Sequence, residues 1–199
     1  WDEGYLLLQG KVVTNYLLSL GYINEEFFAR EYYSPIYYSL KYLFIQIFST
    51  KYQIEANHLT NLFFSLCTII GIKKLSKELF NDKVSIIVFL ILFFFPAFNG
   101  HMGFNSKDTI LALCHVWIFY LSIKYLKNQH IIKKSNNYIN YIAILASVGS
   151  GINLYFLGSL IPLFVFLILD FFIFKKIISK KFNSKRLLVN LLYGVLIFY

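Results

Sequence analysis

The sequence predicts an all-α fold, a polytopic bundle of transmembrane helices with amphipathic helices on its outer face. Three observations predict it. Hydrophobic residues make up 58% of the 199 residues and charged residues only 15%, whereas a soluble domain carries roughly a quarter charged residues. Apolar runs near the length needed to cross a bilayer recur along the chain. Basic residues gather in every second gap between these runs.

The apolar runs predict six membrane spans, of which the last is cut off. They are His58–Ile72, Val84–Phe98, Thr109–Leu126, Tyr138–Phe156, Leu157–Phe174 and Leu187–Tyr199. Asn153, Gly158 and Pro162 favour a tight turn between the fourth and fifth spans. Because the chain starts without a leader pattern and ends inside an apolar run, we expect a fragment of a longer protein that lacks a segment at each end.

The basic residues predict the orientation of the spans. The gaps after the first, third and fifth spans hold most of the 19 basic residues, namely Lys73, Lys74, Lys77, Lys83, Lys124, Lys127, Lys133, Lys134, Lys175, Lys176, Lys180, Lys181, Lys185 and Arg186. The positive-inside rule places these gaps in the cytoplasm. The net charge of +9 is therefore a topology signal and not the signature of a nucleic-acid-binding protein.

Two regions follow from this pattern: residues 1–56 as an outer loop with interfacial helices, and residues 57–199 as one transmembrane domain. Apolar residues recur at three- and four-residue spacing from Tyr5 to Leu20, which predicts an amphipathic helix that ends at Gly21 and lies at the membrane interface. The stretch Pro35–Ser49 reaches only ~22 Å as a helix, too short for a span. We predict that it is interfacial or re-entrant.

Three polar clusters lie on the predicted outer face, at residues 1–5, 30–35 and 101–108. Taken singly, the clusters have a structural interpretation. Asp2 and Glu3 could interact with the positive end of a helix dipole, and Asp108 could cap a helix N-terminus. Their gathering on one face, in loops near the bilayer, predicts a site. The chain has no Walker loop, dinucleotide fingerprint or zinc-protease motif, and both cysteines lie in apolar runs, so we expect no nucleotide cofactor and infer no disulfide.

The same clusters resemble motifs of the GT-C membrane glycosyltransferases, which use polyprenyl-phosphate sugars. This family includes protein O-mannosyltransferases, aminoarabinose transferases and bacterial RgtA/B/C/D-like proteins. Asp2-Glu3 followed by Tyr5 resembles the Asp-Glu motif of the first outer loop. Ser34-Pro35-Ile36-Tyr37-Tyr38 resembles the Pro-Pro-Leu-Tyr-Tyr stretch, and His101, Phe104, Asn105, Lys107 and Asp108 resemble a His-x-x-Phe-Asn-Pro-Lys-Asp loop. Ser34 and Ser106 stand where the family has proline, and Tyr33 where some relatives have a phosphate-binding lysine.

The resemblance, which extends from Trp1 to about Phe174, implies a GT-C-like fold and an inverting glycosyltransferase of hexosyl or pentosyl type. Its catalytic residues would be Asp2, as general base, and the adjacent Glu3. Donor and phosphate binding would fall to Arg30, His101, Asn105, Lys107 and Asp108. His101 and Asp108 would also be the residues available to a divalent metal, which some relatives need. The implied partners are a polyprenyl-phosphate sugar, membrane lipids and an acceptor glycan, lipid or protein. The implied location is a bacterial inner membrane, with the site facing the periplasm.

Two other functions remain open from the residues. A transporter or flippase of lipid-linked glycans would share the spans and the aromatic outer surface. It would also be expected to line the membrane interior with polar or charged residues, which are scarce in the predicted spans. A non-catalytic membrane subunit would use the outer carboxylates only as helix caps.

Overall fold

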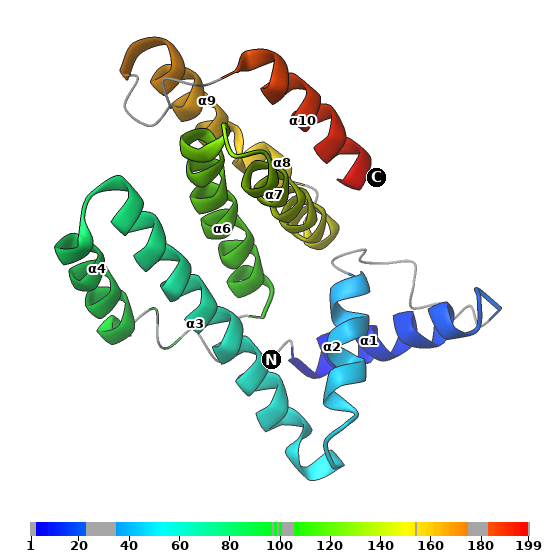
Figure 1. The fold of residues 1–199 in the computed structure, drawn as a ribbon. Helices are drawn as coiled ribbons and strands as arrows, with labels where there is room; N and C mark the ends of the chain where they lie inside the picture. The colour runs from blue at the N-terminus through cyan, green and yellow to red at the C-terminus, as the bar shows by residue number, and fades with distance from the viewer. Residues whose placement is uncertain are drawn as a thin grey trace.

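The computed structural model describes residues 3–22, 35–96, 98, 100, 106–153, 155–174 and 183–198. Every regular element in these ranges is helical, which confirms the predicted all-α fold. The helices form an open bundle in which α3, α4 and α6 run in alternating directions, with α1 and α2 crossing each other at one end (Figure 1).

The elements are α1 (Glu3–Leu18), α2 (Pro35–Ile45), the 3₁₀ turn η2 (Thr50–Tyr52), α3 (Gln53–Leu79), α4 (Asp82–Phe94), α6 (Ser106–Asn128), α7 (Ile132–Ile152), α8 (Phe156–Ser159), α9 (Ile161–Leu169), the π-helical turn η3 (Asp170–Phe174) and α10 (Ser184–Phe198). Each predicted span contains a helix. The fifth predicted span is divided at Leu160. Pro162 lies in the first turn of α9, where backbone N–H groups have no partner within the helix, so the N–H that proline lacks costs no helical hydrogen bond.

Two helical segments are long and apolar enough to cross a membrane by length and composition, Thr50–Leu79 and Lys107–Asn128. Phe156–Leu169 is a shorter apolar stretch. Large apolar side chains also cover the outside of α4, where Ile87, Ile91 and Phe94 are all more than half exposed. A water-soluble surface rarely carries such a patch, and a bilayer accommodates it. The full set of six spans stays a prediction.

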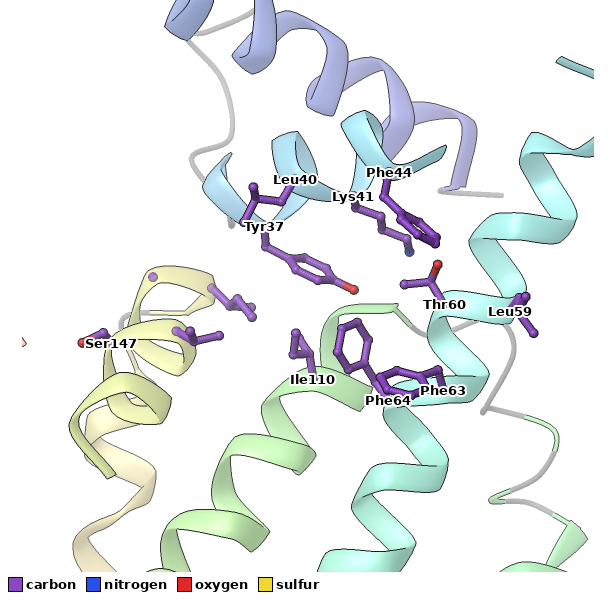
Figure 2. Close-up of a pocket in the computed structure, with 13 residues that line it drawn as sticks. Tyr37, Leu40, Lys41, Phe44, Leu59, Thr60, Phe63, Phe64, Ile110 and Ser147 are labelled. Carbon is purple, nitrogen blue, oxygen red and sulfur yellow. The ribbon is translucent and has the colours of Figure 1, made fainter. Parts of the chain in front are cut away.

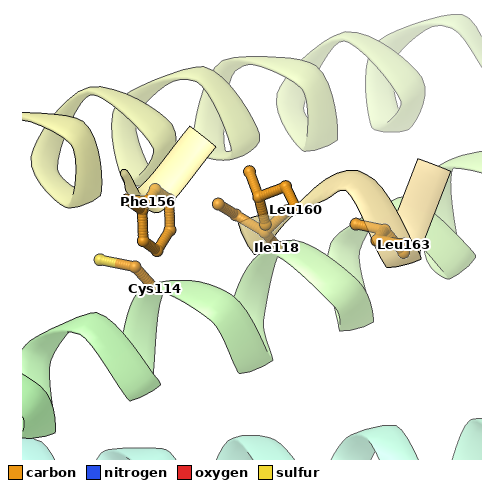
Figure 3. Packing of buried hydrophobic residues seen from close by; sticks show 5 residues of the cluster. All are labelled: Cys114, Ile118, Phe156, Leu160 and Leu163. Carbon is orange, nitrogen blue, oxygen red and sulfur yellow. The ribbon is translucent and has the colours of Figure 1, made fainter. Parts of the chain in front are cut away.

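Helix α6 is the centre of the described bundle, because it packs against α3 on one side and α7 on the other. Figure 3 shows the principal core, in which Cys114 and Ile118 of α6 meet Phe156 of α8, Leu163 of α9 and Leu160 between these two helices. On the other side, the Trp117 indole N–H donates a hydrogen bond to the Cys67 carbonyl of α3 at 3.1 Å. These contacts fix the relative positions of the helices that build the site.

An ion-pair cluster ties α3 to α6 at their lysine-rich ends. The Glu78 carboxylate lies 2.5 Å from the Lys124 ammonium and 3.0 Å from that of Lys127, which also donates to the Glu78 carbonyl. Glu78 is the last acidic residue of α3, and the two lysines are one turn apart on α6, so the pairing locks the register of the two helices. Two of the lysines used to predict topology thus also have a structural role.

The start of helix α10 is held by a buried amide side chain, Gln129, and farther along the helix Asn190 donates to the Tyr125 hydroxyl of α6 at 3.0 Å. The Gln129 side chain is 1% exposed; its Nε2 donates to the Asn183 carbonyl at 2.9 Å, and its Oε1 accepts from the Asn183 backbone N–H at 2.6 Å. The Arg186 guanidinium donates to the Gln129 carbonyl at 2.8 Å. The side chain therefore pairs with the backbone just before α10 as a neighbouring strand would.

We expect Gln129→Ala to loosen the start of α10, because it removes two hydrogen bonds between the Gln129 side chain and the Asn183 backbone. The local opening free energy should fall by about 1–3 kcal/mol. Hydrogen–deuterium exchange of peptides covering 183–190 measures it. The matched control is Asn128→Ala, which removes a bond to Lys124 within α6 and should leave these peptides unchanged. Equal protection of α10 in Gln129→Ala and the native protein would contradict the assignment.

Helices α1 and α2 pack through small side chains. A Cβ atom at Gly10 would overlap the Tyr38 carbonyl oxygen and lie 2.9 Å from the Tyr42 Cβ, so the close approach requires glycine. One turn later, Thr14 Oγ1 lies 2.8 Å from Ser39 Oγ. This is the small-xxx-small contact typical of membrane helices. The buried side of α1 thus includes Gly10, Val12 and Thr14, and the apolar side chains of Leu17 and Leu18 stay exposed.

Candidate functional site

A cavity of about 780 Å³ lies between α2, α3, α6 and α7. Its walls are mainly aromatic and aliphatic (Figure 2), formed by Tyr37, Leu40, Lys41, Phe44, Leu59, Thr60, Phe63, Phe64, Ile110, Ser147, Val148, Gly151 and Ile152. A volume of this size falls within the range of natural ligand sites, which are predominantly apolar with a few placed polar groups. The cavity is therefore the candidate functional site in the part of the chain that the structure describes.

The cavity lies at the end of the bundle opposite the lysine-rich turns. Its residues come from the first half of α3, the first turns of α6 and the last turns of α7. The Glu78 cluster occupies the other ends of α3 and α6. Figure 1 shows the same arrangement, with α2 at the far end of α3 from the turn that joins α3 to α4. The cavity is thus at the end that the charge pattern predicts to be outside the cytoplasm.

A buried ammonium group faces this cavity. The Lys41 side chain is only 6% exposed, and its Nζ donates to Asn61 Oδ1 of α3 at 2.9 Å. The same Nζ lies 5.8 Å from the centroid of the Tyr37 ring, a cation–π distance. Tyr37, Lys41 and Phe44 follow each other at four- and three-residue spacing, so one face of α2 brings all three to the cavity.

The acceptor Asn61 belongs to a buried polar stripe on α3. Asn57, Asn61, Ser65 and Thr68 are each at most 2% exposed and follow one another at four-, four- and three-residue spacing. They therefore occupy one face of the helix, turned towards the protein, while the opposite face presents apolar side chains such as Phe63. Polar side chains at membrane depth are expensive unless they are hydrogen-bonded, so the stripe marks an interior face.

Tyr37 stays a neutral phenol in this setting. Burial raises the pKa of the Tyr37 hydroxyl above its ordinary value, and the neighbouring Tyr38 phenol raises it further. A neutral hydroxyl can donate one hydrogen bond and accept others. Figure 2 shows that this hydroxyl and the Lys41 ammonium both point into the cavity. Tyr37 is therefore suited to bind a polar group and unsuited to act as a base.

The structure brings two of the predicted site residues to this end of the bundle. Lys107 and Asp108 lie in the first turn of α6, three and two residues before Ile110, which lines the cavity. Lys107 is half-buried and Asp108 is exposed. An acidic side chain in the first turn also interacts favourably with the helix dipole. Both residues are thus next to the cavity, and their predicted roles in donor binding stay predictions.

The other predicted site residues are Asp2, Glu3, Arg30, His101 and Asn105. Asp2, Arg30, His101 and Asn105 lie outside the described residues, and Glu3 is described only as the first residue of α1. Within the described ranges no group of three or more His, Cys, Asp or Glu side chains could hold a metal ion. Because His101 is outside them, a metal held by His101 and Asp108 stays a prediction.

Sequence reasoning missed Lys41 and Asn61. In the sequence, Ser39 and Lys41 look like polar interruptions of an interfacial stretch. In the structure both side chains are buried, with exposures of 4% and 6%. A signal was present in α3, because the asparagines at 57 and 61 are four residues apart in an otherwise apolar helix. That spacing predicts one shared polar face.

Fold and site together define a class: an all-helical integral membrane protein with an apolar cavity and a buried cation at one end of its bundle. A sequence profile of the dolichyl-phosphate-mannose-protein mannosyltransferase family matches residues 34–199, and the chain belongs to this family. It is a membrane glycosyltransferase of the GT-C type, as the sequence motifs predict. Comparisons with curated proteins and with solved structures give no match.

Proposed function

We propose that this protein transfers a sugar from a polyprenyl-phosphate donor to an acceptor hydroxyl on the extracytoplasmic face of the membrane. The observation that supports it most directly is the cavity, which combines apolar walls with the Lys41 ammonium at the end of the bundle that carries Lys107 and Asp108. A lipid-linked phosphate has the same two parts, an apolar chain and an anionic group. The family description names mannose as the sugar and protein as the acceptor.

The proposed chemistry is a single displacement with inversion. The acceptor oxygen attacks the anomeric carbon, its proton passes to the Asp2 carboxylate, and the bond from that carbon to the phosphate oxygen breaks with its electron pair. The polyprenyl phosphate leaves as a stabilised anion, so one carboxylate acting as base is sufficient. Glycoside hydrolysis needs a second carboxyl group because an alkoxide is a poor leaving group. Glu3, next in sequence, is the second carboxylate of the proposed catalytic pair.

Cationic side chains offset the charge that grows on the departing phosphate. Lys107, in the first turn of α6, and Arg30 are proposed for this role. His101, Asn105 and Asp108 belong to the same loop and helix start as Lys107, and they are proposed to contact the donor or to hold a divalent metal. The site would face the periplasm of a bacterial inner membrane, in agreement with the position of the cavity opposite the lysine-rich turns.

A transfer assay tests this function. The intact protein is reconstituted in sealed vesicles, and a panel of polyprenyl-phosphate sugars is supplied on the outer side. We expect release of free polyprenyl phosphate and a glycosylated acceptor whose anomeric configuration, measured by NMR, is opposite to that of the donor. Movement of the intact donor across the bilayer without product would instead identify a flippase. Neither transfer nor movement with any donor of the panel would favour a non-catalytic subunit.

A further inference from the structure

The lysine-rich end of the bundle, where α3 turns into α4 (Figure 1), carries more positive charge than its carboxylates balance. Residues 73–83 and 124–127 contain six lysines and two acidic residues, Glu78 and Asp82. Both acids are already ion-paired, Glu78 with two lysines of α6 and Asp82 with Lys77 at 2.7 Å. The other three lysines have no carboxylate partner among the described residues: Lys73, Lys74 and Lys83. This end therefore holds cations with which an anionic partner can pair.

One of these cations, Lys74, lies at the seam between α3 and α6. Its Nζ is 4.9 Å from the centroid of the Trp117 ring of α6, a cation–π distance. The Trp117 indole is itself held against α3, because its N–H donates to the Cys67 carbonyl and a Cβ atom at Gly71 would lie only 2.9 Å from its Nε1. Within the described ranges the Lys74 ammonium makes no hydrogen bond, so its three N–H groups are available to oxygen acceptors.

The surface that leads from Lys74 into the membrane is apolar. Ile70 lies one turn earlier on the same face of α3 and is 44% exposed. On the α4 side of α3, Lys73 lies over the Phe89 ring at 5.2 Å, which repeats the pairing of a lysine with an aromatic side chain. Exposed apolar side chains of a membrane protein face lipid tails, and tryptophan favours the membrane interface. A cation at the end of such a surface matches a molecule with an anionic head and apolar chains.

We propose that the seam between α3 and α6 at the lysine-rich end binds an anionic glycerophospholipid of the surrounding membrane. Its phosphate oxygens accept from the Lys74 ammonium, and an acyl chain lies along Ile70 and Trp117. Lys124 and Lys127 add positive potential from the next turns, because together they exceed the charge of Glu78. The site is at the opposite end of the bundle from the cavity, in the leaflet that the charge pattern predicts to be cytoplasmic. It is independent of the proposed transfer reaction.

Trp117 can report the occupancy of this site. The intact protein is placed in nanodiscs of phosphatidylcholine with a minor fraction of phosphatidylglycerol, and brominated acyl chains, which quench nearby tryptophan, are carried by one lipid or the other at the same mole fraction. The difference between native protein and Trp117→Phe isolates the Trp117 signal from every other tryptophan. We expect phosphatidylglycerol to occupy the site about fivefold more readily than phosphatidylcholine, the effect of one lysine at a membrane surface.

Two variants at position 74 separate the charge from the packing. Lys74→Gln should remove the preference for phosphatidylglycerol, whereas Lys74→Arg should keep it, because arginine retains the charge and can also donate to a phosphate. The matched control is Lys83→Gln, which removes the same charge from an exposed lysine at the same end that likewise has no carboxylate partner among the described residues. We expect this control to retain the preference of the native protein.

Three results would overturn the inference. Equal quenching of Trp117 by the two brominated lipids would show that the seam does not select an anionic lipid. An equal loss of preference in Lys74→Gln and Lys83→Gln would show a diffuse surface potential in place of a site. Displacement of the lipid by an equal concentration of soluble glycerol phosphate would show a site for phosphate alone. None of these measurements involves sugar transfer, so each outcome leaves the proposed function to its own assay.

Discussion

Replacing Asp2 by Asn should lower the rate of sugar transfer by roughly 10²- to 10⁴-fold, the usual contribution of a positioned general base. Asn keeps the size of the side chain and one acceptor oxygen but cannot take the proton of the acceptor hydroxyl. The measurement is the initial rate of glycosylated product, with intact protein, saturating polyprenyl-phosphate sugar and a defined acceptor. Donor binding should be preserved, because Asp2 is proposed to act on the acceptor and not on the phosphate.

The comparison variant is Glu3→Gln, which makes the same chemical change at the second carboxylate of the proposed pair and so separates the base from its neighbour. Because the proposed mechanism uses Asp2 as its single base, we expect a smaller loss of activity from Glu3→Gln. A pH–rate profile adds a second readout, since the acidic limb should report the ionisation of the base and disappear in Asp2→Asn. Normal transfer by Asp2→Asn would reject Asp2 as the base.

Replacing Gly10 by Leu should separate α1 from α2. We expect overpacking to lower the stability of this helix pair by about 1–3 kcal/mol. The new side chain would collide with the Tyr38 carbonyl oxygen, which belongs to the backbone of α2 and cannot rotate away. Because Asp2 directly precedes α1 in the sequence and α2 lines the cavity, the same change should also reduce sugar transfer.

A disulfide assay detects the separation directly. Thr14 Oγ1 and Ser39 Oγ are 2.8 Å apart, so cysteines at these two positions should cross-link readily in the native packing. Adding Gly10→Leu should slow this cross-link strongly. Lys11→Leu is the control, because it adds the same side chain to the exposed position next in sequence on α1. A cross-link that forms at the native rate in the presence of Gly10→Leu would show that α1 does not pack on α2 through Gly10.

The amino-acid sequence by itself determined the fold class and the family. Low charge content and recurrent apolar runs indicate a membrane protein. In lipid, each run forms a helix because a helix satisfies the hydrogen bonds of its own backbone N–H and C=O groups. The helices then form where the runs predict them, from α3 to α10. The two motifs between Ser34 and Asp108 fall within the region that the family profile matches. Short motifs of this kind can be recognised in a sequence without coordinates. The predicted roles of Asp2 in catalysis and of Arg30 and His101 in donor binding fall on residues outside the described ranges and stay predictions.

Only the tertiary structure decided where the cavity lies and which polar residues face it. Lys41 and Asn61 are 20 residues apart, and their 2.9 Å contact arises because α2 crosses α3 at the end opposite the Glu78 cluster. The close packing of α1 on α2 at Gly10 likewise depends on the backbone of the partner helix, which the sequence of α1 does not contain. In a bilayer, apolar side chains are as stable against lipid as against protein, so hydrophobicity does not specify the packing face. Close approach of small residues and satisfied hydrogen bonds specify it, and both depend on the partner helix.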